Sequence, residues 1–297
     1  MGGYDSQQLR ALAAIADAGS LDAAASALAL TPSAVSQRLR ALERACGQVL
    51  VVRSRPIALT AAGEAVLRLA TQVALLEEET HRELAGEQAG AAARTPLAVA
   101  VNADSLATWF LPAVAPLADA IELRVQREDE GLTSELLRRG VVMAAVTTQA
   151  EPVAGCESTA LGVMRYRPMA APGFARRWFA GADADAFRHA PVVTFDAADQ
   201  LQQRFLRRQT GADPRPPFHL VPASADYLRA IELGFGWGLV PEPQLAGRAA
   251  DYDGLVALTP DHLDVALHWQ RWSLRTASLR ALTVAVLTAA RSELRQP

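Results

Sequence analysis

The chain has 297 residues, of which 51% are hydrophobic, and a formal net charge of −3 at pH 7. This length exceeds one ordinary domain, so we expect two or three units, each with its own core. The slight acidity argues against a generic polyanion binder, and the lack of an apolar run of roughly 18 residues argues against a membrane span.

Cysteine and histidine usage narrows the class further. The two cysteines, Cys46 and Cys156, have no paired spacing, and the five histidines show no ligand spacing. We therefore expect no disulfide scaffold, no metal site and no cofactor. The segment MGGYDSQQLR lacks a basic region followed by an apolar one, so no secretory signal is predicted and the expected location is the cytoplasm.

The first 46 residues predict three helices. Apolar residues at helical spacing mark residues 6–18, Gly19 ends that helix, and Ser20 is placed to cap the next. Thr31-Pro32 starts the third helix, because threonine caps well and proline is tolerated at the first helical position. Three residues of this helix are expected in the core: Val35, Leu39 and Leu42.

The opposite face of the third helix is polar. It carries short hydroxyls, an amide and guanidinium groups: Ser33, Ser36, Gln37, Arg40 and Arg44, with Arg38 flanking them. Such side chains hydrogen-bond base edges and phosphates when a helix enters the major groove of double-stranded DNA. A solvated helix face explains residues 33–44 equally well when they are considered alone.

The next segment favours the DNA-binding interpretation. Two apolar arms, 49–52 and 57–59, flank Arg53-Ser54-Arg55-Pro56, which predicts a hairpin with two arginines at its tip. Residues 31–60 contain five arginines and one glutamate, a local charge of +4 on an acidic chain. We therefore predict a winged helix-turn-helix over 1–60 that binds operator DNA, with Arg53 and Arg55 in contact with the backbone or the minor groove.

These residues also carry a family resemblance. The segment SLDAAASALALTPSAVSQRLRALERACGQVLVVR, followed by LTAAGE, resembles the N-terminal domain of LysR-type transcriptional regulators. Further along, LVVRSRPIALTAAGEAVLRLATQVALLEEE, VAVNADSLATWFLPAVAPL, GFGWGLVPE and LHWQRW resemble the ArgP/LysG subgroup, which regulates export of basic amino acids. The resemblance implies a homodimer or homotetramer that acts with RNA polymerase, and a two-lobed effector-binding domain like periplasmic binding proteins.

Residues 61–89 predict one long linker helix. Its apolar stripe includes Val66, Val73 and Leu84. The stripe is too long to be buried entirely against a domain of some 60 residues. We expect an antiparallel helix of a second subunit to cover the stripe, as the family has it, and Glu77-Glu78-Glu79 to form a solvated rim. The alternative is a helix packed on the C-terminal domain of its own chain.

After residue 94 the pattern alternates between strands and helices. Strands are expected at 97–101, 121–126, 141–147, 191–195, 218–221 and 237–240. Helices are expected at 106–117, 132–139, 201–208 and 225–233. This order predicts two sets of parallel α/β units. The resemblance implies an effector domain at 94–297, with lobe I at 94–163 and 267–297 and lobe II at 164–266.

Ligands of parallel α/β folds bind beyond the carboxyl ends of the strands. The polar residues expected there, with one tryptophan, are Asn102, Asp104, Ser105, Glu128, Asp129, Thr147, Thr148, Asp196, Ser224 and Trp237. Several carboxylates for cations, with a helix start for an anion, suit an amino acid with a basic side chain. Each acid has a structural alternative: Asp104 caps its helix, and one or two of Glu128, Asp129 and Glu130 are plain surface charge. Trp237 also has one, as a core residue.

The sequence contains no recognisable catalytic motif, so we expect that the protein is not an enzyme and has no catalytic residues. The prediction is a regulator that senses lysine, with arginine second, and controls an amino acid exporter gene. Two alternatives remain: a nonspecific nucleoid-type DNA-binding protein, and a metabolic enzyme or solute-binding protein with a helical appendage.

Overall fold

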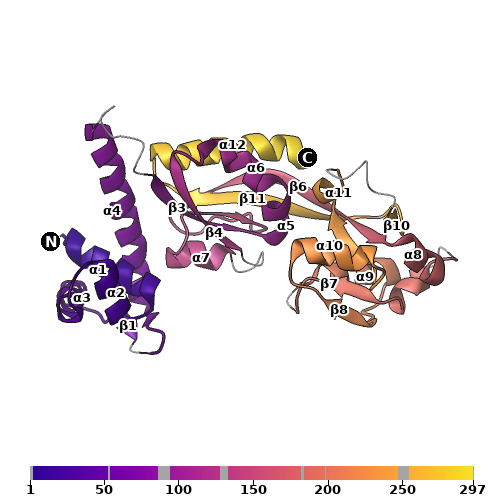
Figure 1. The fold of residues 1–297 in the computed structure, drawn as a ribbon, viewed down its shortest axis with the longest axis horizontal. Helices are drawn as coiled ribbons and strands as arrows, with labels where there is room; N and C mark the ends of the chain where they lie inside the picture. Colours follow the sequence, from indigo (N-terminus) through magenta and orange to yellow (C-terminus); the bar gives the residue numbers. More distant parts are fainter. Residues whose placement is uncertain are drawn as a thin grey trace.

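A computed structural model gives the structure of residues 3–52, 54–85, 94–127, 133–181, 184–197, 199–246 and 254–296. A helical N-terminal unit, a long helix and a two-part α/β region follow one another along the longest axis of the molecule (Figure 1). Among the described helices, none combines the length and the apolar character that crossing a membrane requires.

The N-terminal unit forms the elements that its sequence predicts. They are α1 Ser6–Ala18, α2 Leu21–Ala27, α3 Pro32–Cys46, β1 Val51–Val52 and β2 Ala58–Leu59. Gly19 ends α1 in the left-handed region at φ 65°, which glycine adopts without strain, and Ser20 Oγ accepts from the backbone of Ala23. The helices pack around a small core that includes Leu12, Ile15 and Leu42.

The long helix α4, Ala61–Ala85, connects this unit to the rest of the chain. Residues 86–93, which the prediction partly assigned to this helix, lie outside the described residues. Val66, Ala70 and Val73 pack on the N-terminal core, whereas Leu75 is buried in the core of the following domain. Leu75 makes the packing on the C-terminal domain that the alternative supposes, whereas Val66 and Val73 of the predicted stripe pack on the N-terminal unit.

The predicted solvated rim at Glu77-Glu78-Glu79 is wrong. Glu77 pairs with Arg10 of α1 at 2.8 Å, and the two carboxylate oxygens of Glu79 accept from the backbone of Ala277 and Ser278 at 3.0 Å. Those amides belong to the first turn of α12, Ala277–Glu293, where a helix offers unpaired N–H groups. The acidic run connects α4 to elements on both sides of it.

The α/β region is built on a seven-stranded sheet. Its strands are β3 Thr95–Val101, β4 Ile121–Arg127, β5 Ala144–Thr147, β6 Cys156–Ala170, β9 Gly238–Pro241, β10 Val256–Ala257 and β11 Leu263–Trp272. The order is β10-β6-β11-β5-β3-β4, with β9 also paired to β6. The strand-helix pattern predicts parallel pairing, which holds for β3 with β4 and β5; β6 and β11 pair antiparallel. These two long strands carry the chain out of the first lobe and back into it.

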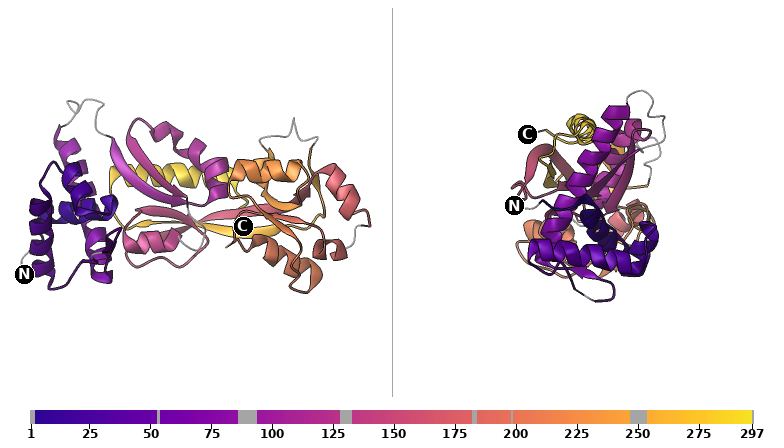
Figure 2. Two further views of the ribbon diagram at one scale, coloured as in Figure 1. Left: turned by 60° about the horizontal axis from the view of Figure 1, so that its bottom comes forward. Right: turned by 90° about the vertical axis from the view of Figure 1, so that its left-hand side faces the viewer.

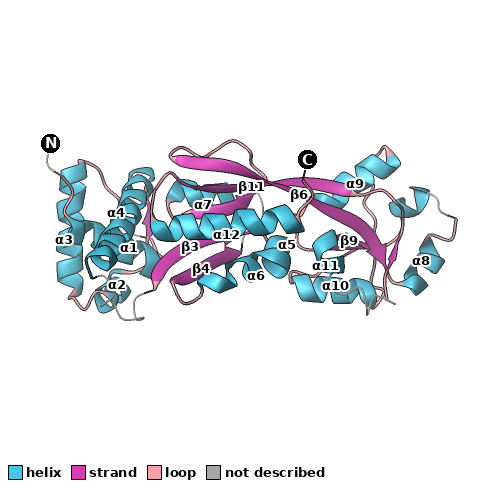
Figure 3. Ribbon diagram, turned by 90° about the horizontal axis from the view of Figure 1, so that it is seen from above, coloured by secondary structure: helices cyan, strands magenta, loops and turns pink. Residues whose placement is uncertain are grey.

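Helices cover both faces of the first lobe. A continuous helical segment comprises α5 Ala103–Ser105, a π-turn at Leu106–Phe110, α6 Leu111–Val114 and a 3₁₀ turn at Ala115–Leu117. In Figures 1 and 3, α6 and α12 lie on one face of the sheet, and α7, Thr133–Arg139, lies on the other. Figure 2 shows the helical unit at one end and the second lobe at the other.

The second lobe contains a separate parallel pair, β7 Val192–Thr194 with β8 Phe218–Leu220. The lobe also contains α8 Pro172–Trp178, a 3₁₀ turn at Ala184–Arg188, α9 Leu201–Thr210, α10 Ser224–Glu232 and α11 Glu242–Ala246. Trp237, between Phe187 and Phe205, is at the centre of this lobe. The lobe therefore has an aromatic core at one end of the long strands.

Candidate functional site

The helix α3 is fixed at both ends and along one face. Thr31 Oγ1 accepts from the backbone of Ala34 at 3.2 Å, and Gly47 ends the helix in the left-handed region. Val35, Leu39 and Leu42 are buried as predicted. Because that face is packed on the N-terminal core, the opposite polar face is held toward solvent in a fixed orientation.

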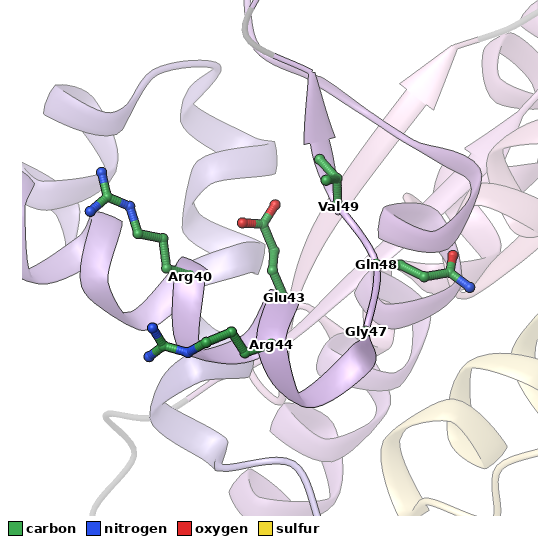
Figure 4. Close-up of a pocket in the computed structure, with 6 residues that line it drawn as sticks. All are labelled: Arg40, Glu43, Arg44, Gly47, Gln48 and Val49. Atoms are coloured by element: carbon green, nitrogen blue, oxygen red, sulfur yellow. The ribbon is translucent and has the colours of Figure 1, made fainter.

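The predicted reading residues follow this division. Ser33, Gln37, Arg40 and Arg44 are exposed, and the two remaining candidates, Ser36 and Arg38, are half-buried. Figure 4 shows the Arg40 and Arg44 side chains extending on the same side of α3. Hydroxyl, amide and guanidinium groups on this face can donate hydrogen bonds to the acceptor atoms of bases and phosphates.

Glu43, the one acid of the basic segment, has a structural role that the sequence did not reveal. Its Oε1 accepts from the backbone of Leu50 at 3.0 Å, just before β1. In Figure 4 its side chain points away from the two arginines toward the segment of Val49. The carboxylate thus fixes the wing to α3.

The wing is the short antiparallel hairpin of β1 and β2, with Val51 opposite Leu59. Arg55 at its tip is exposed, and Arg53 lies outside the described residues. The hairpin is anchored at its base, where Ile57 N donates to Gly19 O at 2.9 Å and Thr60 Oγ1 to Val49 O at 2.7 Å. The wing is therefore anchored to the same helical unit as α3, with Arg55 exposed at its tip.

A second set of candidates lies where the two lobes meet. Asn102 and Ser105 are 4% and 0% exposed, and Asn102 Oδ1 and Ser105 Oγ have no hydrogen-bond partner among the described residues. Thr147 is buried, 3.3 Å from Ser134 Oγ, and Thr148 is half-buried. Glu128 and Asp129 lie outside the described residues.

The carboxylate of Asp104 does not cap its own helix, which was the structural alternative for this residue. Its Oδ2 accepts from the Tyr166 hydroxyl of β6 at 2.8 Å. Burial raises the pKa of Asp104 to about 6, and the charge of Asp199 raises it further, while the tyrosine hydrogen bond opposes the shift. The half-buried Asp104 thus directs its carboxylate to a strand that connects the two lobes.

Of the predicted residues of the second lobe, two stay half-buried and one is in the core. Asp196 Oδ1 accepts from the backbone of Asp199 at 2.9 Å, and the Ser224 carbonyl accepts from Gln244. Trp237 is fully buried between aromatic rings, so packing explains its position, and its contact with an effector stays a prediction.

Four residues of this junction were missed by sequence reasoning: Tyr166, Asp199, Gln202 and Tyr227. Asp199 accepts from the backbone of Phe195 and Leu201, and burial raises its pKa. Gln202 Nε2 donates to the Tyr227 hydroxyl at 3.1 Å, and burial raises the pKa of Tyr227. Asp199 follows β7 closely, as Asp196 does, so the strand-end rule would have found it; the tyrosines lie on β6 and α10, where that rule does not look.

Comparisons with known proteins agree with this geometry. The model of the bacterial regulatory helix-turn-helix protein, lysR family, matches residues 6–64. The lysine export transcriptional regulatory protein LysG of Corynebacterium efficiens is 45% identical over 97% of this chain and 98% of its own length. The chain belongs to the LysR family of transcriptional regulators.

Two solved structures extend the likeness to the whole LysR-family fold. ArgP from Mycobacterium tuberculosis is 42% identical, with a TM-score of 0.88 over 99% of this chain and all of its own. LysG from Corynebacterium glutamicum, with bound effector Arg, is 40% identical, with a TM-score of 0.79 over 98% and 99% of the two chains. The family consists of regulators of transcription, which confirms the expectation that this chain is not an enzyme.

Proposed function

We propose that this LysR-family regulator senses a basic amino acid, lysine first and arginine second, and controls an amino acid exporter gene. The observation that carries the proposal is the likeness over nearly the full chain, both lobes included, to a lysine export regulator and to a structure with bound arginine. The half-buried acids at the lobe junction, Asp104 and Asp199, supply charge of the sign that a basic side chain needs.

For the DNA, we propose that the N-terminal part of α3 reads base edges through Ser33, Ser36 and Gln37. Arg40, Arg44, Arg53 and Arg55 bind phosphate or the minor groove, with Arg38 flanking the reading face. The exposed hydroxyl and amide groups of α3, and the guanidiniums around them, support this assignment. Because the chain contains no lysine, the proposed ionic contacts with phosphate are all made by guanidinium groups, which can donate two parallel hydrogen bonds.

For the effector, the proposed site comprises the residues predicted at the strand ends: Asn102, Asp104, Ser105, Glu128, Asp129, Thr147, Thr148, Asp196, Ser224 and Trp237. The proposed division is 1–60, 61–89 and 94–297, with the chain passing from lobe I to lobe II at 163–164 and back at 266–267. Those positions fall inside β6 and β11, the two strands that connect the lobes. Effector changes DNA binding only if it binds two arrangements of the lobes with different affinity.

For the assembly, we propose a cytoplasmic homodimer or homotetramer that acts with RNA polymerase. Leu76 and Leu84 of α4 are 45% and 80% exposed, which supports a second copy on this helix. Paired reading heads engage half-sites about 34 Å apart or at multiples of that distance.

Isothermal titration with lysine, arginine and a neutral amino acid tests the sensing role. Lysine or arginine binding with no response to the neutral one is expected; equal or absent binding would contradict the proposal. The DNA role is tested at fixed salt with the exporter promoter and with random DNA, for which we expect a difference of ~10³-fold or more. Similar affinity for both would favour the nonspecific DNA-binding alternative.

Two variants separate the roles of α3 and the wing. Arg55→Ala is expected to weaken promoter and random DNA alike and to reduce the salt dependence, whereas Gln37→Ala is expected to cost about 1–3 kcal/mol on the promoter alone. Arg280→Ala, at an exposed position on α12, is the matched control and should bind as wild type. Unchanged binding by both test variants would contradict the proposed reading surface.

A further inference from the structure

Asp104 and Asp199, both half-buried, bring two carboxylates to the junction of the lobes. Asp104 belongs to α5 of the first lobe, and Asp199 precedes α9 of the second. Among the described residues, no arginine or histidine forms an ion pair with either carboxylate, although arginines pair with acids elsewhere on the surface. Because withdrawing a charge from water without a charged partner is unfavourable, such a pair calls for a cation.

The hydrogen bonds around the pair come from neutral donors. Tyr166 donates to Asp104, and the backbone amides of Phe195 and Leu201 donate to Asp199. These bonds orient both carboxylates but leave their negative charge uncompensated. The structure thus fixes two acceptors, one from each lobe, on rigid supports.

A third group belongs to the same cluster. Gln202 is 3% exposed; its amide contacts Asp199, and its Nε2 donates to Tyr227, but its Oε1 has no partner among the described residues. Asn102 and Ser105, whose Oδ1 and Oγ also find no partner in the described part of the chain, lie on either side of Asp104 in the sequence. The missing partner is therefore a group rich in donors, and a guanidinium has five N–H donors and an ammonium three.

We propose that Asp104 and Asp199 bind the side-chain cation of the effector, one carboxylate from each lobe. The inference rests on the proposed function, because it assigns a part of the same effector site. In this arrangement the side-chain cation of the ligand bridges the two lobes. A ligand without a side-chain cation leaves the two negative carboxylates facing each other. The pair therefore determines selectivity for basic over neutral amino acids and favours closure of the lobes around the correct ligand.

The electrostatics of the empty pair are consistent with this role. Burial raises the pKa of both carboxyls, and the charge of Asp199 adds to the shift of Asp104. The other titratable groups around the pair are Tyr166 and Tyr227, both neutral at physiological pH, and Asp196, whose charge adds to the rise in the pKa of Asp199. A bound cation reverses the effect of the like charge and stabilises the ionised form of both carboxyls.

The test compares arginine with citrulline, its neutral isostere, by isothermal titration of the full-length protein at pH 7.5. Wild type is expected to prefer arginine by about 30-fold or more, because losing one partner of a buried charged pair costs at least that much. Asp104→Asn and Asp199→Asn are each expected to reduce the arginine-to-citrulline ratio by about tenfold or more. Asp213→Asn is the matched control, because Asp213 is an exposed acid of the second lobe paired with Arg207.

The outcomes distinguish the two proposals. If wild type binds no basic amino acid, the proposed function itself is overturned. If wild type prefers arginine and both variants keep the ratio, the carboxylate assignment alone is overturned. An equal loss of arginine and citrulline affinity in the variants also overturns it, because the pair would then serve the shared part of the ligand.

A measurement on the wild-type protein covers the case in which the variants do not fold. Between pH 7.5 and 5, protonation of Asp104, whose pKa burial raises to about 6, is expected to reduce arginine affinity and to leave citrulline affinity nearly unchanged. A ratio that stays constant over this range overturns the assignment.

Discussion

Asp104 combines a proposed ligand role with a cost to the folded state. Burial raises its pKa from 3.8 to about 6, so the folded protein binds this proton more tightly than the unfolded chain does. Stability therefore falls as pH rises from about 4 to about 6, and the whole penalty is present above pH 6. Residues that bind charged ligands often destabilise the fold that holds them.

Replacing Asp104 by asparagine should expose this cost. The amide oxygen still accepts from Tyr166, and the buried charge is removed. At pH 7 we expect the Asp104→Asn protein to be more stable by up to about 3 kcal/mol, which is the pKa shift converted to free energy. Urea unfolding at pH 7 and at pH 4 checks the prediction, because the gain should disappear at pH 4. A variant less stable than wild type at pH 7 would contradict it.

Gly63 tests the contact between the wing and the linker helix. A Cβ built on Gly63 would overlap the backbone carbonyl oxygen of Leu50, which cannot move like a flexible side chain. Gly63→Ala should therefore destabilise the N-terminal unit by roughly 1–3 kcal/mol or more, as overpacking does. Urea unfolding measures it, with Gly181→Ala as control because open space surrounds that position. Equal stability of the two variants would mean that the wing adjusts freely.

Single residues were predictable from the sequence where local rules fix them. Gly19, Ser20 and Thr31 end or cap helices as expected, because capping depends on a few neighbours along the chain. The Asp104 bond to Tyr166 was not predictable, since the two residues are 62 positions apart. Long-range partners depend on the packing of the whole domain, which periodicity does not describe.

At the scale of elements, α4 does more than separate two domains. Glu64 pairs with Arg139 of α7 at 2.8 Å, Arg68 donates to the Arg138 carbonyl, and Glu79 caps the first turn of α12. These contacts attach the linker helix to the first lobe on both faces of its sheet. The helix was predictable from its periodicity. Its acidic side chains were predicted to be solvated, because the sequence does not show that tertiary packing brings the start of α12 next to them.

The cap from Glu79 gives a prediction for local dynamics. Glu79→Gln loses one acceptor oxygen and the charge that favours a helix N-terminus, at a cost of about 0.5–2 kcal/mol. Hydrogen exchange of the Ala277 and Ser278 amides should therefore become about 2- to 30-fold faster. Glu77→Gln is the control on the same helix, because Glu77 pairs with Arg10 instead. Equal exchange in both variants would show that the cap does not hold α12.

For the whole molecule, the two lobes were predictable as repeated strand-helix units, but the mixed sheet was not. The strand ends at Val101, Thr147 and Thr194 bring polar residues toward one junction, as the rule for parallel units requires. The antiparallel pairing of β6 with β11 arises because the chain must leave the first lobe and return beside its own path. Alternating patterns show that a strand exists and do not show its direction.

The exposed part of α4 gives the prediction for the assembly. Leu76 and Leu84 are eight residues apart, and nothing in the described chain covers them well: they are 45% and 80% exposed. Residues eight apart lie near the same face of a helix, so a second copy of α4 would bury both leucines. Full burial is worth about 1.5–3 kcal/mol per leucine, and two copies contribute four.

The double variant Leu76→Glu/Leu84→Glu should therefore sediment as a monomer where wild type sediments as a dimer or tetramer. Binding to a promoter with two half-sites should weaken with it, because each reading head then binds alone. Val284→Glu, at a 59% exposed position on α12, is the matched control for added surface charge. Sedimentation velocity at equal concentration decides the matter: an unchanged oligomer in the double variant would mean that the copies meet on another face.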